Sequence, residues 1–417
     1  MGLDMTAWGL FIAGLINQMG RVMIPAVKTT IMADPVLGGG FKEQVGAWLS
    51  AVSLVCLAGK LLGAAVTDKL GGWLVLVVVF ALWIVATGGS IVAQSVESLG
   101  YLWLLNSFAY TITWGASVQV VGTAYEKDPA AKTANLAFCA SASRFGATAG
   151  NIVFGQLLTA GFGWRQVLMP MVPIQVVLLL LMISKWLGAK APAAPKKAAA
   201  GKKAEKEEAP PSVLAAFLSI DFWLMLIPKA LTFTYTQFFM NYIPQLLHDA
   251  YGYDHGMAST LGGVAQGGSI VGLLVVGKYF KALDKGSKVT FVFFELLLCF
   301  LIPAALSLGP AVLPTISVVP LLMIWGVAYA LPFYIPPGEF AMSVGGKAGT
   351  ALFTNIFDAA GFATSAVWNP WASAIAKSGD FTQVLYSQAL FGAISMIFMP
   401  LCMYRVNAKE DAAKKKK

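Results

Sequence analysis

Long apolar runs dominate this sequence and limit what it can fold into. Charged residues, glycines and prolines separate about twelve runs of roughly 18 or more mostly apolar residues, each long enough to cross a hydrocarbon core of about 30 Å as a helix. Hydrophobic residues make up 58% of the 417 positions and charged residues 12%, with a mean hydropathy of +0.72. A water-soluble domain of this composition would expose large apolar patches. The sequence therefore predicts an all-α membrane protein.

The predicted spans form two sets of six. The first set covers residues 5–27, 45–67, 73–94, 100–123, 133–159 and 166–188, and the second covers 220–246, 256–278, 289–308, 313–337, 348–374 and 383–404. Residues 189–212 between them are rich in Ala, Pro, Lys and Glu, which is typical of a disordered linker. We predict an N-terminal six-helix bundle at 1–188, a linker at 189–212, a C-terminal six-helix bundle at 213–404 and a basic tail at 405–417.

The two sets contain a weak internal repeat. KTANLAFCASASRFGATAG, from Lys132, resembles KAGTALFTNIFDAAGFATS, from Lys347, and each segment opens the fifth span of its set. Internal repeats of this kind imply a substrate site near the midplane of the membrane, between two halves that rock against each other.

Basic residues indicate how the chain is oriented. If both termini and the linker face the cytosol, the outward-facing basic residues are few: Lys28, Lys42, Arg165 and Lys377. This bias agrees with the positive-inside rule. We expect a multi-pass protein of the plasma membrane or an organelle membrane, with cytosolic termini and linker. The first run lacks a basic region ahead of it and contains Arg21, so it is expected to be a retained span.

Several functional classes find no support in the sequence. The four cysteines lie in apolar segments without metal-like spacing, and the two histidines lie in a predicted external loop, apart from any Ser/His/Asp set. The Gly-rich segment LGGVAQGGSIVG has neither the preceding strand nor the Lys-Ser/Thr of a nucleotide-binding loop. The net charge of +9 comes largely from linker and tail lysines, so membrane orientation explains it better than nucleic acid does. We expect a monomer in the lipid bilayer, without enzyme activity or cofactor.

Six ionisable side chains lie well inside the predicted spans, and four of them are basic. They are Arg21, Lys60, Arg144, Lys229, Glu295 and Asp358. A charge near the bilayer centre costs about 2.5–3.5 kcal/mol on insertion scales, so each is expected to face a partner or a wet cavity. The excess of cations favours an anionic substrate, and an arginine offers a two-pronged fork for an oxyanion. A desolvated Glu295 or Asp358 could instead carry a coupling proton.

Two further patterns resemble a known family. GKLLGAAVTDKLGG, from Gly59 to Gly72, resembles the loop between the second and third helices of the major facilitator superfamily, with Asp68 as the gating acid, although Gly72 and Trp73 replace its later basic residues. Arg21, Lys60 and the segment KAGTA from Lys347 resemble the organophosphate:phosphate antiporter branch of that superfamily. That branch carries an arginine in its seventh helix, where this chain has Thr236 and Gln237, so its paired-arginine phosphate clamp is incomplete here.

The resemblance implies the major facilitator fold, with twelve transmembrane helices in two six-helix bundles. It also implies that the first, fourth, seventh and tenth helices line the cavity, which adds Tyr110, Gln237 and Tyr329 to the candidate substrate-binding residues. The second and eleventh helices are neighbours across the two halves in this superfamily. Lys60 and Asp358 could therefore form an interdomain ion pair, so that Lys60 would not contact substrate.

Alternatives remain open for the other basic residues. Arg144 could pair with Glu295 or a backbone carbonyl, Lys229 could pair with Asp221 two turns away, and Arg21 could extend toward the outer surface. The preferred interpretation is a secondary active transporter that moves a small anion (phosphate, an organophosphate or a carboxylate) by alternating access, as an antiporter or an ion-coupled symporter. The alternatives are a proton-coupled symporter of a neutral or cationic solute, and a non-transporting membrane receptor on the same fold.

Overall fold

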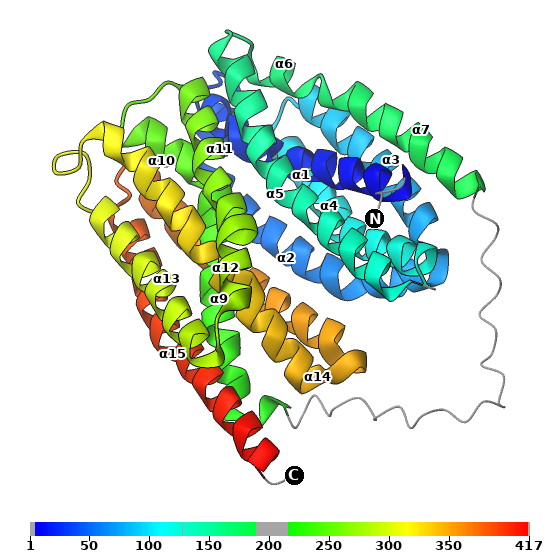
Figure 1. Cartoon of the computed structure of the whole chain (residues 1–417). Coiled ribbons are helices and arrows are strands. Elements are labelled where there is room, and N and C mark those ends of the chain that lie inside the picture. The colour runs from blue at the N-terminus through cyan, green and yellow to red at the C-terminus, as the bar shows by residue number, and fades with distance from the viewer. Residues whose placement is uncertain (1–4, 127, 189–215, 416–417) are drawn as a thin grey trace.

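The computed structural model describes residues 5–126, 128–188 and 216–415, and within them every regular element is helical. The predicted linker at 189–212 lies outside the described residues. The all-helical prediction is confirmed, and Figure 1 shows two groups of helices that diverge toward one end of the molecule. We call that end the linker end, because α7 stops there and the chain resumes there at residue 216.

The first half follows the six predicted spans closely. Its helices are α1 (Met5–Met32), α2 (Gly38–Leu70), α3 (Gly72–Val92), α4 (Val96–Ala124), α5 (Pro129–Thr159), α6 (Trp164–Leu168) and α7 (Met171–Gly188). The sixth span is divided between α6 and α7, with Met169 and Pro170 at the break. A proline lacks the N–H that a continuous helix needs.

The second half contains more irregular helices. They are α9 (Ile220–Asn241), α10 (Ile243–Asp249), α11 (His255–Val271), the π-helix η1 (Gly272–Val276), α12 (Gly277–Ala282), α13 (Lys285–Leu306), α14 (Thr315–Ala376) and α15 (Thr382–Lys415). The seventh predicted span breaks at Tyr242, two residues before Pro244. The predicted tail at 405–417 is not separate from the twelfth span, because α15 continues as a helix to Lys415.

Helix α14 combines the tenth and eleventh predicted spans. A straight helix would place Phe340 and Phe357 about 25 Å apart. Their ring centroids lie 6.1 Å apart, so the chain folds back on itself between them. The two predicted spans are therefore the two arms of a hairpin, which we call the first arm (Thr315 to Phe340) and the second arm (Phe357 to Ala376) of α14.

Glycines in the repeated segment pack corresponding helices together in the two halves. A Cβ atom on Gly146 of α5 would lie 2.3 Å from the carbonyl oxygen of Leu15 on α1, and one on Gly361 of α14 would lie 2.4 Å from the ring of Phe233 on α9. Both contacts require a residue without a side chain. The equivalent packing of α5 on α1 and of α14 on α9 agrees with the weak internal repeat in the sequence.

Within the described residues, eight helices are long and apolar enough to cross a membrane by length and composition alone. Helices α4, α5 and α9 and the second arm of α14 do not meet that criterion. All four contribute residues to the cavity described below. Their lower hydropathy has a physical reason, because side chains that line an aqueous cavity need not be soluble in lipid.

The two halves are packed tightly at the end opposite the linker. Cβ atoms on Gly155 of α5 and Gly256 of α11 would each lie 2.7 Å from the other glycine's carbonyl oxygen, so two backbones touch there. Ser50 of α2 donates a hydrogen bond to the carbonyl oxygen of Ala366 on α14 (2.6 Å), and the Asn369 amide donates to the carbonyl oxygen of Leu49 (3.3 Å). We call these contacts the closed seam.

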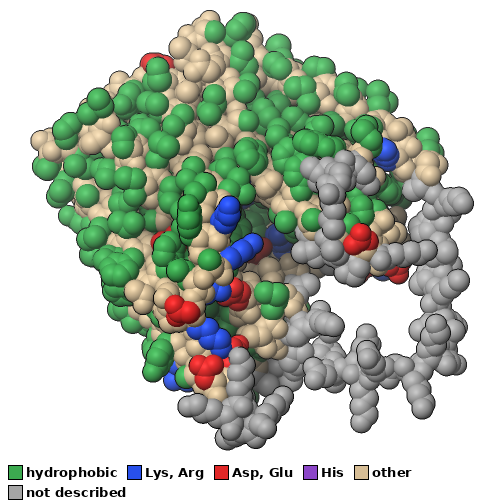
Figure 2. Space-filling model, in the orientation of Figure 1, with side chains coloured by type: hydrophobic (Ala, Val, Ile, Leu, Met, Phe, Trp, Pro, Cys, Tyr) green, Lys and Arg blue, Asp and Glu red, His purple; other side chains and the backbone are tan. Residues whose placement is uncertain are grey.

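A buried lysine belongs to the same seam. Lys28 on α1 is 1% exposed, and its ammonium group donates to the backbone carbonyl of Asn241 and lies 4.6 Å from the ring centre of Tyr242. At the opposite, linker end, Figure 2 shows a hollow between the halves, with acidic and basic side chains around it. The surface farther from that end shows few charged side chains in the same view. The structure is thus closed at one end and open at the linker end.

Candidate functional site

A cavity of about 380 Å³ lies between the two halves. Helices α1, α2, α4 and α5 contribute to its walls from the first half, and α9, α11 and α14 contribute from the second. Among the described residues, five side chains that are charged at neutral pH line it: Arg21, Lys60, Arg144, Lys229 and Asp358. The volume falls within the range of about 300–1,000 Å³ that is usual for small-molecule sites.

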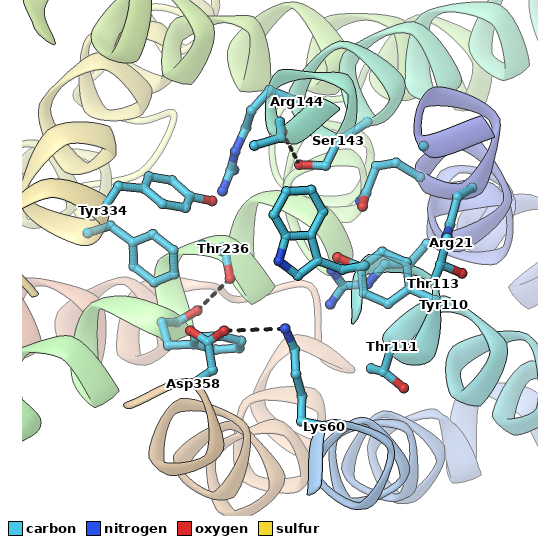
Figure 3. A pocket seen from close by; sticks show the side chains of 18 of the residues that line it. Arg21, Lys60, Tyr110, Thr111, Thr113, Ser143, Arg144, Thr236, Tyr334 and Asp358 are labelled. Atoms are coloured by element: carbon cyan, nitrogen blue, oxygen red, sulfur yellow. Dashed lines mark hydrogen bonds and ion pairs between the residues drawn. The ribbon is translucent and has the colours of Figure 1, made fainter. Parts of the chain in front are cut away.

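Asp358 is held between two lysines. One of its carboxylate oxygens, Oδ2, lies 3.5 Å from Nζ of Lys60 on α2, and the other, Oδ1, lies 3.6 Å from Nζ of Lys229 on α9. The expected pair between Lys60 and Asp358 is therefore present, and it joins the two halves (Figure 3). Each lysine engages a different oxygen, so the carboxylate has an ionic partner on both sides.

Lys229 does not pair with Asp221, the alternative that the sequence left open. Asp221 instead binds Arg405 and Lys409, both on the extension of α15 that the sequence analysis had assigned to a separate tail. Lys229 also donates to the backbone carbonyl of Phe333 at 3.1 Å, and its Nζ lies 3.3 Å from the centre of that ring. A desolvated ammonium group is stabilised by such a ring face as well as by the carboxylate.

The two cavity arginines have aromatic partners. The guanidinium carbon of Arg21 lies 4.2 Å from the ring centre of Tyr110 on α4, and that of Arg144 lies 4.5 Å from the ring centre of Tyr334 on α14. Among the described residues, neither arginine forms an ion pair with a carboxylate, and Arg144 does not meet Glu295 as the sequence allowed. Figure 3 shows both arginines beside the cavity, on different sides of it. Their charge is thus not neutralised by an acidic side chain of the described chain.

Two predicted substrate-binding residues do not line the cavity. Gln237 is 2% exposed and accepts a hydrogen bond from the Asn241 amide at 3.1 Å, while Tyr329 is fully buried against Tyr235 and Phe239. Thr236 takes the place of Gln237 in the cavity wall. One residue turns a helix by about 100°, which is enough to move a side chain from the cavity into the protein core.

Other cavity residues were missed in the sequence although a signal was present. Asn17 and Gln18 line the cavity one turn before Arg21 on α1. Residues three and four positions apart share a helix face. A polar stripe that includes Arg21 was therefore visible in the sequence, whereas nothing in the sequence singles out Ser143 or Gln266, which also line the cavity.

The two remaining predicted gating or coupling residues lie away from the cavity. Asp68 is exposed near the linker end of α2. Glu295 on α13 is 6% exposed, and among the described residues its Oε2 atom has no hydrogen-bond partner. Their predicted roles therefore rest on the sequence alone. The described residues also contain no group of three or more His, Cys, Asp or Glu side chains that could hold a metal ion.

Two halves of membrane-spanning helices around a charged central cavity define a class of membrane transport protein. Residues 10–365 match the family model of the Major Facilitator Superfamily, and the chain belongs to that family. The comparison with curated protein sequences gives no match.

Solved structures with the same fold share little sequence with this chain. The nucleoside transporter NupG has a TM-score of 0.72 and 15% identity, with 96% of this chain and 99% of that chain covered. A bacterial homologue of the human lysosomal transporter Spinster, in an inward-facing and unoccupied conformation, has a TM-score of 0.67 and 13% identity, with 96% of each chain covered. A D-xylose-proton symporter has a TM-score of 0.69 and 14% identity, with 94% and 96% covered. These similarities establish the fold of this chain.

Proposed function

We propose that this protein is a secondary active transporter of a small anion that works by alternating access. The observation that carries the proposal is the charge of the cavity, where four basic side chains face one carboxylate. Lys60 and Lys229 share Asp358, whereas Arg21 and Arg144 have no acidic partner among the described residues. An oxyanion would relieve both unpaired charges and accept charge-assisted hydrogen bonds from the two guanidinium groups.

Asp358 supports a proposed coupling role in the same cycle. Its carboxylate links α2 and α9, which belong to different halves, through Lys60 and Lys229. An anion that enters the cavity competes with this carboxylate for the lysines. Weakening these links would free the linker end to close, while the closed seam opens at the other end. In this scheme residues 1–188 and 213–404 are the two rocking units, joined by the linker at 189–212.

A neutral or cationic substrate is the alternative, and the distribution of partners argues against it. That alternative requires every cavity cation to be neutralised within the protein. Asp358 can balance one of its two lysines, and the described residues supply no second carboxylate to the cavity wall. A neutral substrate that displaces water from the cavity would leave the arginines charged without a partner, which is costly.

Transport assays in proteoliposomes test the proposal. The protein is reconstituted and loaded with one of a set of anions (phosphate, glycerol phosphate, monocarboxylates or dicarboxylates), and counterflow of the labelled anion is measured. We expect counterflow with at least one anion and none with a neutral sugar, a nucleoside or a quaternary amine. Counterflow of a neutral or cationic solute, with no competition by any anion, would reject the proposal, and failure of all solutes would favour a receptor without turnover.

A further inference from the structure

The positions of the two cavity arginines carry information about substrate shape. Helices α1 and α5 pack side by side and run in the same direction, because Gly14 meets Ala142, Leu15 and Gln18 meet Gly146, and Met19 and Val22 meet Gly150. Arg21 lies between Met19 and Val22, so it is level with Gly150. Arg144 lies about six positions before Gly150, which separates the two arginine backbones by about 9 Å along the bundle axis.

The side chains do not close this gap. Arg21 extends to Tyr110 on α4 within the first half, and Arg144 extends across the cavity to Tyr334 on the first arm of α14. The two guanidinium groups therefore rest on separate rings that belong to different halves. A compact anion such as inorganic phosphate could contact both arginines only if at least one of them left its ring, which gives up a contact worth about 0.5–2 kcal/mol.

The charge balance points to more than one negative charge on the substrate. The lining contains four basic side chains and one carboxylate, a net charge of +3 when all are ionised (4 − 1 = 3). A monoanion would leave a charge of +2 in the cavity. A substrate with two anionic groups removes more of this unfavourable charge and can give each arginine its own oxyanion.

The wall of the cavity favours an apolar body between those groups. Aromatic side chains from both halves line it, including Trp114 on α4, Phe233 on α9 and Phe362 on α14. The faces of these rings pack well against methylene groups or a planar ring. Polar side chains, including Gln18 and Gln266, line other parts of the wall.

We infer that the substrate is an elongated organic dianion whose two anionic groups are separated by an apolar body, with an α,ω-dicarboxylate as its simplest form. This inference rests on the proposed anion transport and narrows its substrate class. Arg21 binds one anionic group and Arg144 binds the other, so closure of the cavity around the substrate brings the two halves together.

Binding to purified protein tests this inference. Apparent affinities are obtained from thermal-shift titrations with the dicarboxylate series from malonate to suberate, with hexanoate as the monoanion matched to adipate, and with inorganic phosphate. We expect affinity to increase with chain length beyond malonate, and adipate to bind at least about tenfold more tightly than hexanoate or phosphate, as expected for one additional charged hydrogen-bonding group.

Variants assign the two ends of the substrate. Arg21→Gln and Arg144→Gln should each reduce adipate affinity to that of hexanoate, and should change hexanoate affinity by no more than about twofold, because a monoanion can use the remaining arginine. Lys278→Gln, at an exposed position on α12, is the matched control and should leave both affinities unchanged. Melting curves without ligand show whether each variant is folded. If a glutamine variant is not folded, Arg21→Lys or Arg144→Lys is used in its place.

Each alternative outcome has a defined meaning. If malonate, phosphate or hexanoate binds as tightly as adipate, or if one arginine variant leaves adipate affinity unchanged, the elongated-dianion inference is wrong while anion transport stands. If wild-type protein binds no anion in the set, both the inference and the proposed function are wrong.

Discussion

Lys60 on α2 and Asp358 on α14 form an ion pair between the two halves, with 3.5 Å between Nζ and Oδ2. The lysine side chain is 18% exposed and the aspartate side chain 23% exposed, so both are partly shielded from water. A partly buried pair contributes little net stability, but the loss of one partner is costly because it leaves the other charge uncompensated. These properties suit a contact that forms and breaks during a cycle.

A charge exchange tests this relationship. Lys60→Asp and Asp358→Lys should each reduce counterflow strongly and lower the melting temperature, because each places two like charges side by side. The double variant restores opposite charges between positions 60 and 358 and should recover part of the melting temperature and part of the counterflow, because Lys229 still faces a lysine at position 358. Both single variants and the double variant are compared by the same two assays. A double variant no better than the worse single one would show that the pair does not act as a unit.

The backbone contact at the closed seam gives a second prediction. Gly155→Val places side-chain atoms where α11 now lies, since even a Cβ at this position would be 2.5 Å from the amide nitrogen of Thr260. The seam should therefore open, and a cysteine introduced at the buried Ser53 should react with a maleimide about tenfold faster, which corresponds to about 1.4 kcal/mol.

Gly88→Val in α3 is the control for that experiment. No atom lies within 4 Å of a Cβ built at Gly88, apart from its own helix backbone and chain neighbours, so labelling at position 53 should stay at the background rate. The four natural cysteines are all buried and are replaced by alanine or serine before labelling. Equal rates for the two glycine variants would mean that the seam does not limit access.

The buried Lys28 at the same seam gives a third prediction. Lys28→Met removes an ammonium group whose burial costs several kcal/mol. It also loses a charged hydrogen bond to the Asn241 carbonyl, worth about 1.5–3 kcal/mol, and the contact with the Tyr242 ring. The closed seam should become more stable, so the variant should melt at a higher temperature and transport more slowly. A lower melting temperature with unchanged transport would indicate that the bond to Asn241 dominates. Lys42→Met, at an exposed position on α2, serves as the comparison.

A pH dependence is expected from Asp34, in the loop between α1 and α2. Burial by itself would raise the pKa of Asp34, but hydrogen bonds from Trp164, from the backbone amides of Leu37 and Val36 and from Arg165 outweigh it and lower the pKa to about 2. A carboxyl group with a depressed pKa stabilises the folded protein above its ordinary pKa near 4 and loses that contribution as the pH falls toward 2. We expect ionised Asp34 to contribute about 1 kcal/mol to the free energy of unfolding at neutral pH, because Arg165 is partly exposed and solvent screens its charge.

Melting curves of wild-type protein and Asp34→Asn between pH 7 and pH 3 measure this contribution. The variant should melt lower at pH 7, and the difference should shrink below about pH 4. A difference that is constant with pH would show that the ionised form of Asp34 is not what stabilises the loop.

Glu295 gives the fifth prediction, which concerns proton coupling. Its buried carboxyl group lies outside the cavity, on a helix that packs against α15. Glu295→Gln keeps the shape of the side chain without an ionisable group. Because Glu295 lies outside the cavity, transport and its pH profile should be unchanged in this variant. Asp358→Asn, in the cavity, should by contrast alter both. Loss of the pH dependence of transport in Glu295→Gln would instead restore Glu295 as a coupling residue.

The fold could be predicted because the hydropathy of each segment follows from its own residues and does not depend on tertiary contacts. Runs near 313–337 and 348–374 were recognised as separate spans, and the hairpin of α14 provides one arm for each of them. The breaks at Tyr242 and between α6 and α7 depend on prolines inside apolar runs, which hydropathy alone does not register.

The cavity could be predicted only in part. A charge inside a membrane span is energetically costly and therefore indicates a partner or a wet cavity. This cost identified five of the cavity residues: Arg21, Lys60, Arg144, Lys229 and Asp358. The choice of partner for each charge could not be derived in the same way. Lys229 binds Asp358, which is 129 positions away, in preference to Asp221 on its own helix. Which of Thr236 and Gln237 lines the cavity depends on how α9 is rotated about its axis. A single sequence does not determine that rotation.

The position of Asp358 implies that the empty protein already contains a resident anion. A carboxylate between two ammonium groups from opposite halves resembles an acidic solute held in its site, except that it is tethered to the polypeptide. In an unloaded cycle this carboxylate would offset the charge of one of the two lysines, whereas an anionic substrate would have to displace it. The ease with which Asp358 rotates away from the two lysines and returns would therefore decide between strict exchange and net uptake.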